Sequence, residues 1–154
     1  MNESLRIADQ LHRAFFGQAW HGPSVKDALA GVAAESATAR PFEGAHSIWE
    51  LVHHLHAWIR EADETIRGKK YESLKGDRDW PPVTHTSPAA WEQLQTALDQ
   101  SEISLEDAVR GFPPEKLGEG ERSYYALLIG TVQHNAYHAG QIVLLKKPEF
   151  HRTS

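Results

Sequence analysis

The sequence contains no cysteine, and this absence excludes several kinds of chemistry. Disulfide bonds, thiolate metal sites and a cysteine nucleophile are all ruled out. The chain also lacks any apolar run close to the roughly 20 residues that a membrane-spanning helix needs. Residues 1–20 carry charges throughout and have no apolar stretch like that of a signal peptide. We therefore expect a cytoplasmic protein with no membrane partner.

Clustered positive charge is also scarce. The chain has 16 lysines and arginines against 21 acidic residues, a formal net charge of -5, and no run of basic residues longer than a pair. A nucleic-acid-binding protein normally presents a basic face, so we expect no nucleic-acid partner. The 154 residues, 40% hydrophobic and 24% charged, fit one globular domain over 1–154. Histidine is the abundant exception, with ten residues.

Apolar residues recur at helical spacing along most of the chain, and no β-hairpin signal competes with them. Long helices are expected over about 5–16, 48–67, 88–110 and 124–147, with a short additional helix after Ser24. The alanine-rich segment 33–40 is expected to fade into a loop at 41–45. Typical start and stop signals are the Ser47/Glu50 capping-box spacing, Ser87-Pro88, Ser123, Gly68 and Pro148. The pattern predicts an all-α fold, an up-and-down type of four-helix bundle.

Two of the ten histidines fall on the apolar stripe of the last expected helix. His138 lies near the centre of the stripe and His134 on its shoulder, one turn apart on one face. Imidazoles at this spacing can share a metal, as in the zinc-protease helix motif, but Asn135 replaces the glutamate of that motif. A zinc protease is therefore not predicted. Core packing without metal is the alternative, although buried imidazole nitrogens need partners, which favours metal binding.

A third ligand is expected from the helix that contains three closely spaced histidines. His53 points away from the apolar stripe, whereas His54 and His56 lie on its opposite shoulders. The flanking Leu51 and Trp58 favour His54 without excluding His56. Three neutral imidazoles would leave coordination positions open and the metal charge unquenched, an arrangement suited to activating water or a thiol.

Residues 46–55 (HSIWELVHHL) and 133–142 (QHNAYHAGQI) together resemble the DinB-like proteins and their YfiT-like relatives. The likeness extends over essentially the whole chain, including the loop at 79–81. It implies a four-helix bundle, often a homodimer, with a metal site formed by His54, His134 and His138. Zinc, nickel, iron and manganese are all possible in the family. Characterised relatives include thiol-dependent transferases and a mycothiol-dependent maleylpyruvate isomerase, in which a low-molecular-weight thiol is activated at the metal.

The functional prediction is a metal-dependent enzyme, a hydrolase or a thiol-dependent S-transferase that acts on a small-molecule substrate. A low-molecular-weight thiol is the expected cosubstrate of the transferase. The alternative is a non-catalytic metal-binding protein with a regulatory or stress-related role, and a helical interaction module with core histidines ranks third. The sequence does not select the metal, because imidazole suits several divalent ions.

Other side chains near these histidines are also candidates. Glu61 and Gln141 each lie seven residues after a predicted ligand and could orient an imidazole or a bound water. For Glu61 a solvated position is the preferred interpretation. Tyr137 is expected to pack between helices, and Asn135 to satisfy a buried backbone group. Four tryptophans are expected in the core, with a place in a pocket wall as the alternative: Trp49, Trp58, Trp80 and Trp91.

Overall fold

The computed structural model describes residues 1–41, 43–120 and 123–147. Its α-helices are α1 (Glu3–Phe16), α2 (Val25–Leu29), α3 (Ala34–Ala37), α4 (Ile48–Ile66), α5 (Pro88–Arg110) and α6 (Tyr124–Leu145), and its 3₁₀ turns are η1 (Gly76–Arg78) and η2 (Pro114–Lys116). No strand occurs among the described residues, which confirms the predicted all-α fold. None of these helices has the length and apolarity to cross a membrane. Pro148, the predicted stop of the last helix, lies outside the described residues.

The ends of the long helices are set by their own side chains. The Ser47 hydroxyl accepts the Glu50 N–H at 3.2 Å, and the Glu50 carboxylate accepts the Ser47 N–H at 2.8 Å, which completes the predicted capping box of α4. Ser87 and Ser123 cap α5 and α6 through their side chains. After α4, Gly68 adopts a φ of +106°, a conformation that glycine tolerates without strain.

The alanine-rich segment differs from the prediction. No separate helix was expected before the loop at 41–45, whereas the structure has the single turn α3, because Ala34 and Ala37 bury their methyl groups in the core at 7% and 0% exposure. The bundle therefore carries two short α-helices rather than the one expected. The predicted short helix is α2, which begins with a capping box formed by Ser24 and Asp27.

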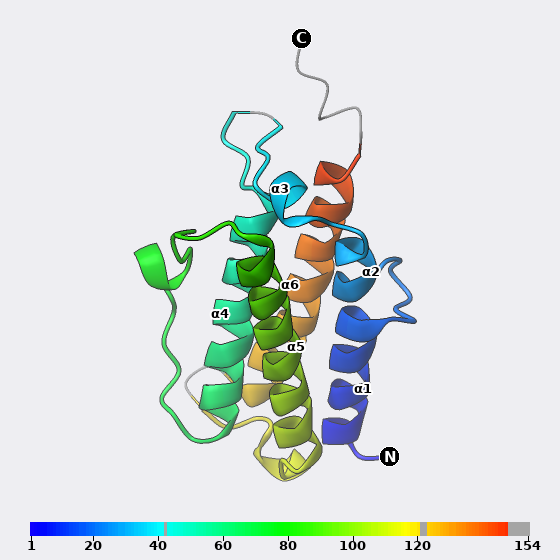
Figure 1. The fold of residues 1–154 in the computed structure, drawn as a ribbon. Coiled ribbons are helices and arrows are strands. Elements are labelled where there is room, and N and C mark those ends of the chain that lie inside the picture. Colours follow the sequence, from blue (N-terminus) through cyan, green and yellow to red (C-terminus); the bar gives the residue numbers. More distant parts are fainter. Residues whose placement is uncertain (42, 121–122, 148–154) are drawn as a thin grey trace.

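The four long helices surround one core in the order α1, α5, α4, α6 (Figure 1). Helices α4 and α5 run parallel, because Trp49 packs against Trp91 near their starts and Ser104 bonds to Asp63 near their ends. The connection 67–87 therefore travels back along the length of α4 (Figure 1). This long crossover replaces the strict alternation of helix directions in a simple up-and-down bundle. Helix α6 runs antiparallel to α4.

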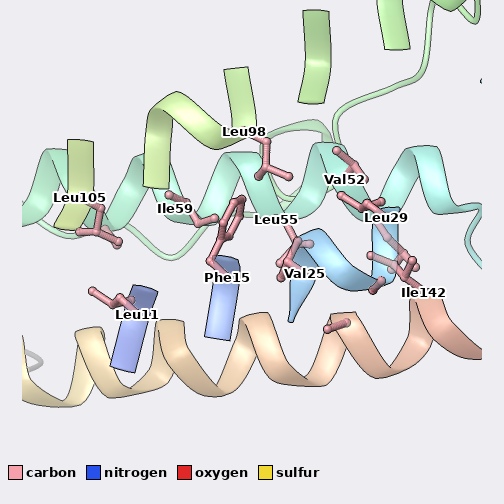
Figure 2. Packing of buried hydrophobic residues seen from close by; sticks show 14 of the residues in the cluster. Leu11, Phe15, Val25, Leu29, Val52, Leu55, Ile59, Leu98, Leu105 and Ile142 are labelled. Carbon is pink, nitrogen blue, oxygen red and sulfur yellow. The ribbon is translucent and has the colours of Figure 1, made fainter. Parts of the chain in front are cut away.

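A continuous cluster of apolar side chains from all six α-helices forms the core. Figure 2 shows part of it, with labelled residues from α1, α2, α4, α5 and α6. Phe15 of α1, Leu55 of α4 and Leu98 of α5 are fully buried, and Ile142 brings α6 into the same cluster. Burial of each such side chain contributes roughly 1.5–3 kcal/mol. The packing holds α4 and α6 side by side.

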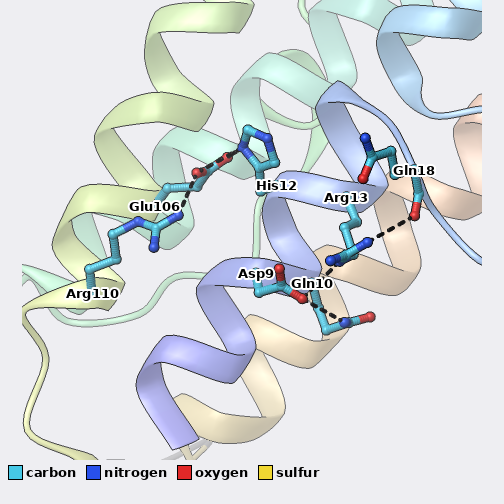
Figure 3. A network of polar contacts seen from close by, with 7 residues as sticks. All are labelled: Asp9, Gln10, His12, Arg13, Gln18, Glu106 and Arg110. Carbon is cyan, nitrogen blue, oxygen red and sulfur yellow. Dashed lines mark hydrogen bonds and ion pairs between the residues drawn. The ribbon is translucent and has the colours of Figure 1, made fainter. Parts of the chain in front are cut away.

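A polar contact ties α1 to α5 (Figure 3). Nδ1 of His12 lies 3.2 Å from each carboxylate oxygen of Glu106, and Arg110 approaches the same carboxylate at 3.5 Å. Glu106 is buried, so these partners compensate for the loss of water around its carboxylate.

Candidate metal centre

His54 of α4 and His134 and His138 of α6 converge on one point between the two helices. Nε2 of His134 lies 2.9 Å from Nε2 of His54 and 3.0 Å from Nε2 of His138. One ring nitrogen from each histidine, a potential metal ligand, lies within 4.8 Å of the other two, and no other such group of three is found among the described residues. The structure therefore brings together the three histidines named from the sequence.

The two neighbouring histidines of α4 lie elsewhere. His53 and His56 border a hollow on another side of the helix, together with Arg60 and Glu61. Both are half-buried rather than fully solvated. Of the two candidates that helix geometry left open, His54 lies in the histidine cluster and His56 does not.

The outer nitrogens of two rings are held by protein acceptors. Nδ1 of His54 lies 2.7 Å from the backbone carbonyl oxygen of Asp79 and 3.1 Å from its carboxylate. Both groups only accept, so Nδ1 carries the proton. Nδ1 of His138 donates in the same way to the side-chain oxygen of Gln141 at 2.6 Å. In both rings Nε2 is left as a bare lone pair that faces the third histidine.

The three inner nitrogens cannot satisfy one another in the neutral state. His134 has one proton for two facing lone pairs, and its own Nδ1 is buried with no hydrogen-bond partner in the described part of the chain. A cation at the meeting point would accept all three lone pairs. Nitrogens in a tetrahedral zinc site are about 3.3 Å apart for bonds of about 2.0–2.1 Å. Two of the three separations, 2.9 and 3.0 Å, come close to that value, and three neutral imidazole nitrogens within 4.8 Å of one another are a donor set that suits a divalent metal.

Burial keeps the imidazoles neutral. It lowers the pKa of His134 to about 3, with a further lowering from the neighbouring His138 and His54. Burial also lowers the pKa of His138 to about 4, although the hydrogen bond to Gln141 opposes the change. The pKa of His54 is lowered by burial as well, against the opposing effect of Asp79. Neutral imidazole is the form that binds metal, so at neutral pH no proton has to leave.

Aromatic rings enclose one side of the centre. The Trp80 ring stacks on His54 with centroids 3.9 Å apart, and His46 stacks on Trp80 at 3.6 Å. Trp58 donates its Nε1–H to the Asp79 carboxylate at 2.7 Å. The core positions predicted for Trp49 and Trp91 are found, whereas Trp58 and Trp80 are half-buried beside the histidines.

The crossover 67–87 brings Asp79 and Trp80 to the site. Glu61, buried in α4 at 3% exposure, accepts the Lys69 ammonium at 2.9 Å and the backbone N–H of Glu72 at 2.8 Å. These bonds anchor the start of the crossover to α4, so neither a solvated position nor contact with an imidazole describes Glu61. For Trp80 the sequence offered a pocket wall as the alternative to a core position. Asp79 and His46 had no predicted role at the site, and their only signal was their place in the segments 79–81 and 46–55 that resemble the family.

Three predictions for α6 had different outcomes. Gln141 does orient an imidazole, that of His138. Tyr137 is 64% exposed, so its predicted packing between helices is wrong within this chain. Asn135 is fully buried, but its side-chain atoms have no hydrogen-bond partner among the described residues, so the role of satisfying a backbone group is also wrong.

A hollow of about 320 Å³ opens beside the centre, and we call it the metal-side hollow. Two of the three histidines form part of its wall. Its full lining is His54, Trp58, Tyr71, Asp79, Ala126, Leu127, Gly130, Thr131 and His134. A molecule in this space would reach the histidine centre directly.

Comparison with known proteins gives one match. A family model described as the DinB superfamily matches residues 20–142, which include the three histidines, Asp79 and Trp80. No match was found among curated proteins or among solved structures.

Proposed function

Because the chain belongs to the DinB superfamily and its three imidazoles converge, we propose that it binds one divalent metal ion through His54, His134 and His138. The observation that carries the proposal is that three Nε2 atoms meet at one point. In His54 and His138 the Nε2 atom presents an unprotonated lone pair, because Nδ1 donates its proton to Asp79 or Gln141. A divalent ion bound by three neutral ligands keeps its charge and supplies Lewis acidity, which lowers the pKa of a water or thiol that reaches it.

We further propose that the activated group is a low-molecular-weight thiol or a water molecule, which makes the protein an S-transferase or a hydrolase. The metal-side hollow favours an enzyme over a non-catalytic metal-binding protein, because it gives a small molecule room beside two of the ligands. Asp79 fixes the ring of His54, and Trp80 covers a face of that ring against solvent.

The first experiment measures the metal content of protein purified without an affinity tag and reconstituted with zinc. We expect about one ion per chain for the wild type and none for a triple variant with alanine at 54, 134 and 138. The matched control is the double variant His53→Ala, His56→Ala, which removes two histidines of α4 from outside the centre and should keep its metal. Equal metal in the triple variant would refute the site.

A second measurement separates the enzyme from the non-catalytic alternative. Cobalt(II) replaces zinc in the reconstituted protein, and its visible spectrum is recorded while a thiol is added. A shift to a spectrum with a sulfur ligand supports activation of a thiol at the centre. An unchanged spectrum at saturating thiol, together with no hydrolysis of ester or amide substrates, would leave a metal-binding protein without catalysis.

A further inference from the structure

The lining of the metal-side hollow is mainly apolar. Trp58, Leu127 and Ala126 give it apolar walls, and none of the lysines and arginines that the structure describes lines it. Because the two histidines are neutral, the charged group among the described lining residues is the Asp79 carboxylate, which accepts from Trp58. The Thr131 hydroxyl donates to the backbone oxygen of Leu127 at 3.0 Å, so its proton is already used.

This lining discriminates by charge. A carboxylate or phosphate on a ligand would meet Asp79 with no basic side chain to pair with among the described lining residues, and it would lose its water against apolar walls. Three basic side chains of α4 and the crossover are paired with acidic groups that do not line the hollow: Arg60 with Glu64, Lys69 with Glu61 and Glu64, and Arg78 with Glu72. An uncharged, apolar body avoids both costs.

Gly130 explains why the hollow is open. It lies inside α6, where glycine is less favourable than alanine, and its φ lies outside the left-handed region. A Cβ added at this position would meet nothing within 4 Å, so packing inside the chain does not require glycine here. A side chain at 130 would instead project into the hollow that Gly130 lines, and would occupy part of its 320 Å³.

From these observations we propose that the metal-side hollow selects small uncharged ligands with an apolar body, and that Gly130 is a specificity-determining residue that keeps it open. The inference rests on the proposed metal site, since the ligand is taken to reach the metal with one donor atom. A volume near the lower end of ligand pockets limits the ligand to a compact molecule such as a single-ring thiol.

The test uses two thiols that differ by one charge, phenylmethanethiol and 4-(sulfanylmethyl)benzoate. Each is titrated into the cobalt-loaded full-length protein, and binding is followed by the sulfur-to-cobalt absorption band. We expect the neutral thiol to bind at least about tenfold more tightly than the carboxylate. Equal affinities, or tighter binding of the carboxylate, would overturn the selectivity for uncharged ligands.

Substitution of the glycine tests its role. Gly130→Leu should weaken binding of phenylmethanethiol at least about tenfold while cobalt content stays near one ion per chain. The matched control is Gly140→Leu, at an exposed glycine of the same helix where a Cβ also meets nothing and which does not line the hollow. Loss of affinity in both variants, or in neither, would refute the role of Gly130.

Metal analysis distinguishes the two levels of failure. A wild-type protein that takes up no cobalt would overturn the metal site and this inference together. A wild-type protein that holds cobalt but binds both thiols alike would overturn this inference alone. If Gly130→Leu failed to fold, the comparison of the two thiols on the wild type would still decide the selectivity.

Discussion

At the scale of single residues, Gln141 has the most direct effect on the proposed centre, because its side-chain oxygen fixes the ring of His138. Gln141→Leu should weaken zinc binding about 10–100-fold, since the imidazole loses the partner that sets its orientation. Competition with a chromophoric chelator measures the change. Gln133→Leu, at an exposed glutamine of the same helix, is the control. Gln141→Glu keeps an acceptor oxygen and should retain affinity; equal losses in Gln141→Leu and the control would contradict the orienting role.

Glu102 is a second residue whose behaviour follows from its surroundings. It lies in α5 at 0% exposure, and neither carboxylate oxygen has a hydrogen-bond partner among the described residues. Burial raises the pKa of this carboxyl well above its ordinary value, the nearby Glu106 raises it further, and Asn135 of α6 opposes the change. His12 of α1 is paired with Glu106 rather than with Glu102. The folded protein therefore holds a proton on Glu102 at pH values where the unfolded chain has released it.

The sign of the pH dependence follows. Between the unfolded pKa of about 4.3 and the raised folded value, the unfolded state binds fewer protons, so this group lowers stability as pH rises. The slope approaches about 1.4 kcal/mol per pH unit inside that window and vanishes above it. Glu102→Gln cannot ionise and should be more stable than the wild type at pH 7. Urea unfolding from pH 4.5 to 8 measures both proteins, and parallel curves would contradict a raised pKa.

At the scale of secondary-structure elements, the caps of α4 offer a test that leaves the metal centre intact. Ser47→Ala removes the hydroxyl that accepts the Glu50 N–H and should lower the free energy of unfolding by about 1 kcal/mol. His54 lies two turns further along the helix, so zinc affinity should not change. Urea unfolding gives the stability and chelator competition the affinity. A large loss of affinity would mean that the helix start and the site are coupled.

The elements themselves were largely predictable because their signals are local. The Ser47/Glu50 pair, Ser87-Pro88 and Gly68 each act within one helical turn, and each stands where the sequence placed it. The convergence of the histidines was predictable for the same reason, since two of them share one face of one helix. Only the segment 33–40 departed locally, because the burial of two alanine methyl groups there favours a helical turn, α3, that was not predicted.

The direction of α5 could not be predicted in this way. A polar connection of the length of 67–87 can return a helix antiparallel to its predecessor or, as here, carry the chain back to start a parallel one. The position of Asp79 and Trp80 beside His54 depends on that choice. Asp79 is 25 residues from His54 along the chain, and the contact between its carbonyl oxygen and the His54 ring could therefore be found only in the structure.

At the scale of the whole molecule, removal of the metal should destabilise the fold. A ligand that binds only the folded state adds stability by mass action, about 4 kcal/mol at a thousandfold excess over its Kd. Addition of EDTA to zinc-loaded protein should lower its melting temperature by several degrees. The triple histidine variant provides the control, because it should melt at the same temperature with and without EDTA. If EDTA left the melting temperature of the wild type unchanged, the prediction that bound metal stabilises the fold would be contradicted.

The homodimer suggested by the family resemblance stays a prediction, and α6 is where we expect its contact. This helix carries no Lys, Arg, Asp or Glu from Tyr124 to Leu145, and Tyr137 on it is 64% exposed. Two chains of net charge -5 repel each other least across such an uncharged face. Tyr137→Glu should convert a dimer to monomers in sedimentation equilibrium, whereas a monomeric wild type would remove the prediction.

The contact between His54 and His134 joins positions 80 residues apart in a chain that has no cysteine. An ion held by both rings would act as a staple that closes this long loop, including the whole of α5. A permanent cross-link that closes a loop of this length would stabilise the folded state by roughly 4.5 kcal/mol, because it lowers the conformational entropy of the unfolded chain. Unlike a disulfide, this link would depend on the availability of metal rather than on redox state. Loss of the metal would therefore weaken the attachment of α6 to α4 without breaking a covalent bond within the chain.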